Sequence, residues 1–600
     1  MTRGVNNARL IVAAAFFLLP GCLSGAGQLH QPASPALVQA SPAGMPDLIR
    51  RYQTDESYIS RFWSMPWSDA RWEHMQSLYQ EWLSKLDALD YGSLSVGDRV
   101  DFHLLRSHIV WSQSGLELEK KRLAEMDAVM PFRAALQGLE LSRRRMEPCD
   151  AKAAAVVLAD AAEQAKKIRK RVEDGRKDAD KRAADAIALS PAVALRAAGE
   201  LDDLAGEVDS WSGFYSEFVP DFDWWVREPR GEALKEVRDL AKYLREEVAG
   251  IKGKDEDPLV GDPIGRDALL ADIQGEMLAY TPEELIAIGE SEMTWCEGEL
   301  KKAAADMGLG DDWRAALAKV KDDQVPPGNQ APFVRDEAHA MVKFIKDRSL
   351  VTIPELCEDS WRIEMHSPET QRFLPYAVYG GQHIGVSYAA ESMSNADKLM
   401  SMRGNNRHFT HIVAPHELIP GHHLQGYYAQ REHTYRQMFY TPFYVEGWAL
   451  YWELRLWDLG WAGATGQDAA MDRVGMLFWR MHRAARIVVS LKFHLGQMKP
   501  SEMVDFLVDR VGHERSGATA EVRRYISGGY SPLYQCGYMI GGLQLRSLRH
   551  ELVDSGKMTD HQFNDAVLCE NAIPIEMVRA ELEGTSLPKD WKPAWKISEP

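Results

Sequence analysis

Three histidines and a glutamate fall within eight consecutive positions, His416-Glu417-Leu418-Ile419-Pro420-Gly421-His422-His423. Zinc hydrolases use a helical His-Glu-x-x-His because residues four apart share a helix face, so two imidazoles reach one ion and the glutamate faces the bound water. Here Pro420 takes the second histidine's place. On a straight helix the sixth residue after His416 is rotated by about 120° and the seventh lies about 10 Å along the axis. Because proline and glycine interrupt helices, the sequence predicts a zinc-binding helix broken between its histidines.

A third metal ligand must come from another element, and Glu446 is the best candidate. Thr441 and Pro442 are typical of a helix start, which places Glu446 in the first turns of a second helix. A buried acid among aromatic and aliphatic residues needs a partner, and a metal is one. Glu453 lies two turns further on and could orient a ligating histidine. The alternative is that Glu446 is an exposed or capping acid near the helix N-terminus.

The residues His416-Glu417, Pro420 to His423 and Glu446 to Tyr451 resemble a bacterial family of unknown function, domain of unknown function 885. That family is similar to gluzincin zinc metallopeptidases of the thimet oligopeptidase and Taq carboxypeptidase types. The resemblance extends from about Asp47 onward. It implies a mainly α, large helical body with a small β-sheet next to the metal-site helix, and a bound zinc ion (Zn2+). The implied zinc ligands are His416, His422 or His423, and Glu446, with Glu417 as general base.

The choice between the two adjacent histidines depends on how many residues the broken helix loops out. His422 requires only the two-residue insertion, whereas His423 requires one residue more. We therefore expect His422 to bind the metal. His423 remains an alternative ligand, or a hydrogen-bonding partner beside the centre.

A late motif of the family, a proline followed by a tyrosine and then a glycine, resembles Pro532, Tyr538 and Gly541. A tyrosine hydroxyl near the metal can donate to the oxyanion that forms when water attacks a carbonyl, and we assign this role to Tyr538. Tyr530 and Tyr534 are rivals, and a purely structural tyrosine is the alternative.

A further stretch, running from Arg483 to His494, offers two candidate substrate-binding residues. Arg486 and His494 stand eight residues apart and could reach the cleft. The family commonly has an acid where Ser490 stands, so a possible partner for either residue is missing. A surface or ion-paired arginine is the alternative.

The elements that must position these residues are mostly helices. Residues 45–330 form an expected N-terminal helical region and residues 331–600 a metallopeptidase-like catalytic region, in one continuous fold. The hydrophobic and charge patterns predict helices over the ranges Trp72 to Leu89, Val100 to Met126, Ala151 to Leu204, Thr281 to Met307, Ala469 to Leu495, Ser501 to Val511, Ala520 to Ile526, Met539 to Leu552 and Asp560 to Cys569.

Near Ile353 the helical pattern gives way to short stretches with β-branched and aromatic residues, which predicts a small sheet before the metal-site helix. The expected strands are Trp361 to Met365, Phe373 to Tyr379 and His383 to Tyr388, with Gly380-Gly381 as the hairpin turn between the last two. An edge strand beside the metal could pair with a peptide substrate, and this would place three residues at the cleft: Gly385, Ser387 and Tyr388. Alternatively, the hairpin only covers the core.

The N-terminus is typical of a bacterial lipoprotein signal. Residues 1–21 combine Arg3 and Arg9 with a short apolar run, and Cys22 follows as the expected lipidated residue. Residues 22–44, rich in Gly, Ala, Ser and Pro, are the expected flexible linker. The predicted location is an exported lipoprotein held at a membrane by its lipid and facing the periplasm or cell exterior. Ordinary secretion, with an incidental cysteine, is the alternative.

Charge and cysteine content exclude several classes of function. The formal net charge of −18 argues against nucleic acid and anionic lipid as partners. The cysteines other than Cys22 are odd in number and widely scattered, which is not the pattern of a disulfide scaffold or a Cys-rich metal site.

Three hypotheses remain for the function. The first is a zinc hydrolase that cleaves peptide bonds in short peptides. The second is an amide hydrolase or isopeptidase acting on cell-wall or amino-acid conjugates with the same metal centre. The third is a non-catalytic binding lipoprotein, against which the presence of Glu417 counts, because a site that only binds metal needs no general base.

Overall fold

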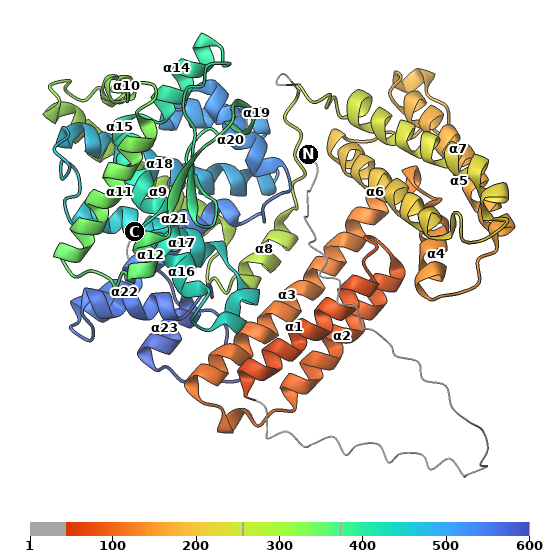
Figure 1. Cartoon of the computed structure of the whole chain (residues 1–600), viewed down its shortest axis with the longest axis horizontal. Coiled ribbons are helices and arrows are strands. Elements are labelled where there is room, and N and C mark those ends of the chain that lie inside the picture. Colours follow the sequence, from red (N-terminus) through yellow and green to blue (C-terminus); the bar gives the residue numbers. More distant parts are fainter. Residues whose placement is uncertain (1–43, 255–256, 372–373, 599–600) are drawn as a thin grey trace, which may run out of the picture. The chain divides into compact units, whose positions relative to one another are not determined.

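The computed structural model describes residues 44–254, 257–371 and 374–598, and these residues are mainly helical with one small sheet, as predicted (Figure 1). The predicted signal peptide, Cys22 and the linker up to Ala43 lie outside the described residues, as does Phe373 of the predicted sheet. Residues Gly44–Pro600 form one compact unit.

The N-terminal helices bury apolar residues at helical spacing. In the second helix Leu78, Trp82 and Leu86 recur every fourth position and are all buried. The first three helices pack against one another, and the fifth to seventh form a second group (Figure 1). The helices are α1 (Met45–Phe62), α2 (Asp69–Asp87), α3 (Val96–Met126), α4 (Arg133–Arg144), α5 (Ala151–Gly175), α6 (Pro191–Tyr215), α7 (Phe222–Tyr243), α8 (Arg266–Gly275), α9 (Pro282–Asp306) and α10 (Trp313–Asp322).

The stretch predicted as helical from Ala151 to Leu204 contains two helices, α5 and the first part of α6. After α5 the chain folds back, and Ile187 donates from its backbone N–H to the carbonyl of Arg171. Ser190 then caps α6 by accepting from the Val193 N–H, and Pro191 occupies its first turn. Proline fits a first turn because its missing N–H is not needed there.

The middle of the chain carries the sheet. Its elements are α11 (Gln330–Asp347), α12 (Glu355–Asp359), β1 (Arg362–Met365), α13 (Pro368–Gln371), β2 (Val378–Tyr379), β3 (His383–Val386), α14 (Asn395–Gly404), α15 (Arg407–Glu417) and α16 (His422–Ala429). The strand order is β1-β3-β2, with β1 parallel and β2 antiparallel to β3. The hairpin predicted at Gly380-Gly381 is confirmed, but its first strand is only two residues long.

The C-terminal helices surround the site. They are α17 (Pro442–Asp458), α18 (Ala469–His494), α19 (Pro500–Phe506), α20 (Arg515–Ile526), α21 (Tyr534–Arg549), α22 (Asp560–Cys569) and α23 (Ile575–Glu583), the last of which was not predicted. Helices α17 and α21 approach closely because glycines meet at their contact. A Cβ on Gly447 would lie 2.7 Å from the Gly541 backbone. This contact fixes α17, which carries Glu446, against α21, which carries Tyr538.

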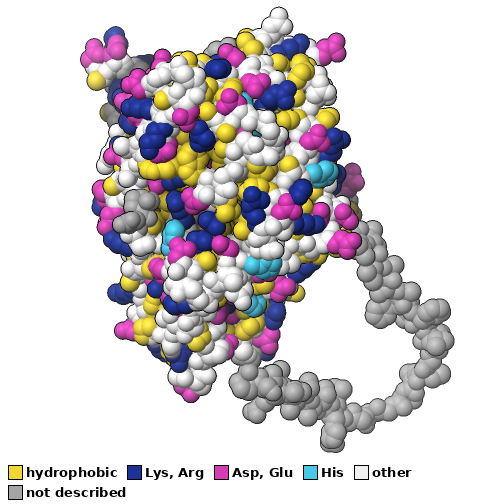
Figure 2. Space-filling model, turned by 90° about the vertical axis from the view of Figure 1, so that its left-hand side faces the viewer, with side chains coloured by type: hydrophobic (Ala, Val, Ile, Leu, Met, Phe, Trp, Pro, Cys, Tyr) yellow, Lys and Arg dark blue, Asp and Glu magenta, His cyan; other side chains and the backbone are white. Residues whose placement is uncertain are grey.

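The surface carries both charge signs. Figure 2 shows acidic and basic side chains interspersed over one face, with hydrophobic side chains grouped between them. The net negative charge is therefore not gathered into one acidic patch on this face. Within the described part of the chain, every helix is too short or too polar to cross a bilayer.

Candidate metal centre

The predicted break between the first two histidines is present. Helix α15 ends at Glu417 and α16 begins at His422, with a sharp turn between them. Gly421 is required in this turn because a Cβ there would lie 1.8 Å from the carbonyl oxygen of His416. The Trp448 indole N–H donates to the carbonyl of Pro420 at 2.8 Å, which satisfies a carbonyl that the break leaves free. The break brings the His416 and His422 rings to 4.9 Å between centroids, nearly perpendicular to each other.

Helix α17 brings Glu446 to the same point. Thr441 caps this helix by accepting from the Phe443 N–H, and Pro442 follows, as the sequence predicts. One Glu446 carboxylate oxygen, Oε2, lies 3.2 Å from His422 Nε2 and 3.9 Å from His416 Nε2. The three ligand atoms lie within 4.8 Å of one another.

The chemistry of these three groups suits a zinc ion. Glu446 Oε2 is buried and accepts no hydrogen bond from the described residues, although two imidazole nitrogens face it. Burial alone would raise the pKa of Glu446, but the His422 imidazole beside it holds the pKa well below the usual range. Two imidazole nitrogens and one carboxylate oxygen are the ligand set of catalytic zinc sites that keep a fourth position open.

The neighbours of these ligands are arranged to hold them. Glu453 Oε1 lies 2.6 Å from His416 Nδ1, which places the carboxylate behind the ligand nitrogen. The Tyr534 hydroxyl donates to Glu446 Oε1, the oxygen that faces away from the histidines. Glu417 is buried next to His416, and burial raises the pKa of its carboxyl.

His423 belongs to a different contact. Its Nε2 lies 2.8 Å from the Cys357 carbonyl and its Nδ1 lies 3.1 Å from the Tyr379 hydroxyl. A carbonyl can only accept, so Nε2 carries the proton and Nδ1 accepts from Tyr379. The second ring nitrogen is therefore occupied, and the structure brings His422 rather than His423 to the other two ligand atoms.

A cavity of about 400 Å³ opens beside the cluster. Its size is that of a small-ligand site, which ranges from about 300 to 1,000 Å³. The segment before and within β2, rather than β3, forms one wall. The polar side chains that line the cavity include Tyr379, His416, Glu417, His422, Glu446, His482, Arg483, Arg486, Glu521, Arg524, Tyr530, Tyr534 and Tyr538.

Tyr538 lies at this cavity, with its ring nearly parallel to that of His416. Its ring and that of His416 are 6.3 Å apart between centroids and inclined by 11°. Burial raises the pKa of Tyr538 to about 12, so its hydroxyl keeps its proton at neutral pH and can donate. Its rival Tyr534 contacts Glu446 instead, and the Tyr530 ring packs against Tyr534 with 4.5 Å between centroids and a tilt of 46°.

The three residues expected at the cleft from β3 do not line it. Gly385 lies in the middle strand of the sheet, where both edges are paired. The Ser387 hydroxyl donates to the Leu374 carbonyl at 2.6 Å, and the Tyr388 hydroxyl donates to the carbonyl of Val325. Both side chains are buried in the core. This part of the hairpin therefore covers the core, which was the alternative to a role in substrate binding.

The two candidate substrate-binding residues on α18, Arg486 and His494, lie in different places. Arg486 lines the cavity, whereas His494 does not. His494 is buried at the end of the helix, where burial lowers its pKa to about 4. The partner expected near Ser490 comes from another helix: Arg486 donates to Glu521 of α20 at 3.1 Å. Sequence analysis missed Glu521 and Arg524, which the i, i+3 spacing on an expected helix could have indicated.

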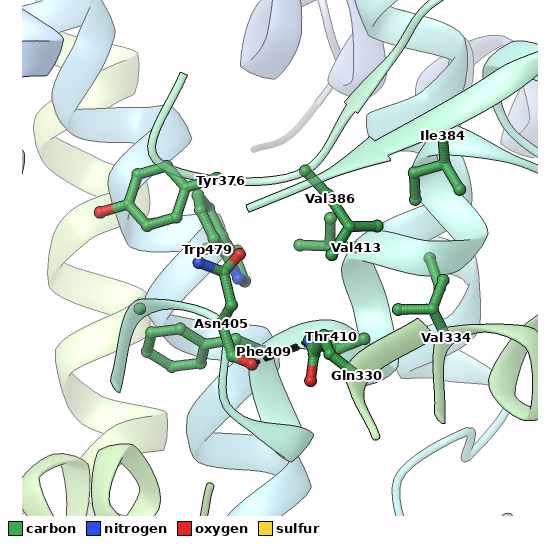
Figure 3. A pocket seen from close by; sticks show the side chains of 13 residues that line it. Gln330, Val334, Tyr376, Ile384, Val386, Asn405, Phe409, Thr410, Val413 and Trp479 are labelled. Atoms are coloured by element: carbon green, nitrogen blue, oxygen red, sulfur yellow. Dashed lines mark hydrogen bonds between the residues drawn. The ribbon is translucent and has the colours of Figure 1, made fainter. Parts of the chain in front are cut away.

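The sheet packs against α15, the helix that carries His416. Figure 3 shows the space between them, which is lined by apolar side chains such as Val334, Val386 and Val413. Its volume, about 10 Å³, is close to the smallest that can hold one water. At the start of α15, Gln330 donates to the Asn405 carbonyl at 3.1 Å. This close packing fixes α15 under the sheet.

The fold and the site together define a large helical protein with a small sheet and a buried His-His-Glu cluster. The chain belongs to a family of bacterial proteins of unknown function, DUF885, whose sequence profile matches residues 58–582. Comparison with curated protein sequences gives no match.

Two solved structures share the fold. A proposed lipoprotein of unknown function from Shewanella oneidensis is similar with a TM-score of 0.64 at 15% identity, over 90% of this chain and 100% of that one. A proposed lipoprotein from Colwellia psychrerythraea has a TM-score of 0.53 at 15% identity, over 90% and 98%. At this identity the likeness concerns the fold.

Proposed function

We propose that this protein is a zinc-dependent hydrolase that cleaves peptide bonds in short peptides. The observation that carries the proposal is the convergence of His416, His422 and Glu446 ligand atoms within 4.8 Å, beside the buried carboxyl of Glu417 and a cavity. A binding protein would need the first three residues but not the fourth.

The roles of the residues follow from their positions. His416, His422 and Glu446 would hold the ion, with Glu453 and Tyr534 fixing two of them. Bound zinc would supply a Lewis acid that lowers the pKa of water and polarises a carbonyl.

Proton transfer falls to the chain itself. Glu417 accepts a proton from the attacking water and passes it to the leaving amine, a task for which a carboxyl with a raised pKa is suited. Tyr538 donates from its hydroxyl to the carbonyl oxygen as that oxygen gains negative charge. The cavity volume of about 400 Å³ favours short substrates.

The test is a comparison of two neighbouring histidines. Zinc content of the full chain is measured by elemental analysis for the wild type, His422→Ala and His423→Ala. We expect near-stoichiometric zinc in the wild type, its loss in His422→Ala and its retention in His423→Ala. Zinc loss in both variants, or in neither, would contradict the ligand assignment.

The reaction is tested separately with a peptide library and Glu417→Gln as the matched control, because this variant keeps the shape and the zinc but removes the base. We expect cleavage by the wild type and a rate at least about a hundredfold lower in the variant. Cleavage of cell-wall or amino-acid conjugates without cleavage of peptides would favour the amide hydrolase. Zinc binding without either activity would favour a binding lipoprotein.

We also propose that Cys22 carries a lipid that tethers the protein to a membrane facing the periplasm or cell exterior. The spacing Leu19-Pro20-Gly21-Cys22 supports this, and both similar structures are of proposed lipoproteins. Mass spectrometry of the N-terminal peptide and membrane fractionation of Cys22→Ala test it. An unmodified Cys22, or a variant that stays with the membrane, would refute the tether.

A further inference from the structure

Three arginines, Arg483, Arg486 and Arg524, line the cavity next to the candidate metal ligands, and each has one guanidinium nitrogen without a hydrogen-bond partner among the described residues. Arg486 donates from Nε to the Tyr525 hydroxyl at 2.8 Å and from Nη2 to Glu521 at 3.1 Å. Its Nη1 has no hydrogen-bond partner among the described residues, although Arg486 is only 2% exposed. A buried donor without a partner costs free energy, so this group is suited to a ligand.

The cavity lining holds three arginines and three glutamates, which are Glu417, Glu446 and Glu521. One oxygen of Glu521 accepts from Arg486, from Arg524 at 2.8 Å and from Tyr525 at 2.6 Å, so a single carboxylate serves two guanidinium groups. Arg483 pairs with Glu453 at the longer distance of 3.6 Å, and Glu453 also serves His416. The three lining glutamates equal the arginines in number, so a bound zinc ion would leave the cavity with an excess of positive charge. An anionic ligand would offset this charge.

Arg483 and Arg486 lie close to His416, with the Tyr538 ring between them. The guanidinium carbons of Arg483 and Arg486 lie 4.6 and 4.3 Å from the centroid of the Tyr538 ring. That ring is parallel to His416 at 6.3 Å. Arg486 is therefore within about three residue lengths of a metal ligand, counting about 3.5 Å per extended residue.

We propose that Arg486, with Arg483 and Arg524 beside it, binds a carboxylate of the substrate. Guanidinium groups match carboxylates in charge and planar geometry, and two donors of one arginine can bind both oxygens. The free carboxylate of a peptide lies one residue beyond its last peptide bond. When that carboxylate is held at Arg486, the protein releases a C-terminal fragment of one to about three residues.

The chemistry of this step is hydrolysis. Water adds across the scissile C–N bond, the acyl side keeps the hydroxyl as a carboxylate, and the amine of the released C-terminal fragment takes the proton through Glu417. This specificity rests on the proposed function, since it concerns the substrate of the same centre.

The test measures binding, which does not require turnover. Full-chain Glu417→Gln is titrated by calorimetry with three peptides that differ at one end: acetyl-Ala-Ala-Phe as the free acid, the same peptide as its amide, and acetyl-Ala-Ala-Asp as its amide. We expect the free acid to bind about ten- to a hundredfold more tightly than the Phe amide, as one charge-assisted hydrogen bond predicts. Equal affinity of these two would overturn the proposal. Tight binding of the Asp amide as well would show that an acidic side chain can supply the carboxylate.

Arginine variants in the Glu417→Gln background locate the preference. Arg486→Lys keeps the positive charge but loses the paired donors of the guanidinium group. We expect this variant to bind the free-acid and amide peptides with affinities within about threefold of each other. Arg480→Lys is the matched control, because Arg480 lies on the same helix, is buried and pairs with Glu292 at 2.7 Å outside the cavity lining. A preference lost in both variants, or in neither, would contradict the assignment to Arg486. Thermal unfolding of each variant shows whether it is folded. The comparison of free-acid and amide peptides in the Glu417→Gln protein does not depend on the arginine variants.

The outcomes separate this proposal from the proposed function. A chain that prefers the free acid but holds no zinc and cleaves no peptide would refute the hydrolase and keep the carboxylate site. A zinc-containing chain that cleaves peptides and binds acid and amide equally would refute the carboxylate site and keep the hydrolase.

Discussion

Two buried arginines in this protein have opposite surroundings. Arg436 follows α16 and donates to Asp101 of α3 at 2.8 Å, to Glu570 and to Glu581 of α23. Its three nitrogens all have carboxylate partners, and it ties the N-terminal helices to the C-terminal ones. Arg486 shares one carboxylate with a second arginine and leaves one nitrogen without a partner, at a cavity.

The difference separates a structural role from a binding role. A buried charge that is fully paired has no capacity for a ligand, and removing it leaves its partners unpaired. A buried charge that is incompletely paired beside a cavity gives up stability in the free protein, and a ligand can return it. The predictions below test this contrast at the two arginines and at the carboxyls related to them.

The largest effect is expected at the fully paired arginine. Arg436→Met leaves Asp101, Glu570 and Glu581 without their cation, and we expect a loss of about 3–5 kcal/mol in the free energy of unfolding. Arg486→Met leaves one carboxylate that still has Arg524, so its loss should be clearly smaller. Urea unfolding of both variants measures the difference. Equal losses would remove the distinction between the two surroundings.

Glu276, a buried carboxyl with no basic partner among the described residues, extends the comparison of paired and unpaired buried charges. Glu276 accepts from the Thr441 hydroxyl, and burial raises its pKa to about 8. Because the folded state then holds a proton that the unfolded state has released, this group's contribution is complete below about pH 4.5. It falls as pH rises to about 8, by at most about 1.4 kcal/mol per unit.

The measurement is urea unfolding of wild type and Glu276→Gln between pH 5 and pH 8. The variant carries a neutral amide at every pH, so its stability relative to the wild type should increase across this range. A stability difference that stays constant with pH would show that Glu276 is ionised in the folded state as in the unfolded one.

Much of this site could be predicted because its signals are local. The helix break follows from Pro420 and Gly421, and the position of Glu446 follows from the Thr441-Pro442 helix start. The mainly helical body follows from the apolar periodicity. Each of these properties depends on residues within a few positions of one another.

What could not be predicted depends on tertiary packing. The spacing of His422 and His423 left both possible, and only the contact of His423 with Cys357 and Tyr379 shows its different place. Gly385 was expected at the cleft because strand order cannot be derived from the strands themselves. Glu521 and Arg524 join the site from a helix about 100 residues beyond His416. Their i, i+3 spacing indicates an ion pair, but nothing local places that pair at the cavity.

The carboxylate shared between the centre and the cavity gives an intermediate effect. Glu453→Gln keeps the side-chain shape but removes the charge that faces both His416 and Arg483. We expect zinc affinity to fall about ten- to a hundredfold, as for other residues that orient a ligating histidine. Competition with a zinc chelator measures it. Glu292→Gln, which faces Arg480 instead, should leave zinc affinity unchanged, and an equal loss in this control would point to a general effect of buried glutamates.

The smallest effect is expected from the neutral partner of the third ligand. Tyr534→Phe removes the hydroxyl that donates to Glu446 Oε1 and keeps the ring that packs against Tyr530. One hydrogen bond to a carboxylate that the proposed zinc ion would neutralise contributes about 1 kcal/mol, so zinc affinity should fall about fivefold. The same chelator competition measures this, with Tyr530→Phe as the control. A loss as large as that of Glu453→Gln would mean that Glu446 depends on its tyrosine more than His416 depends on its carboxylate, and that the charged partner is not the main support of the centre.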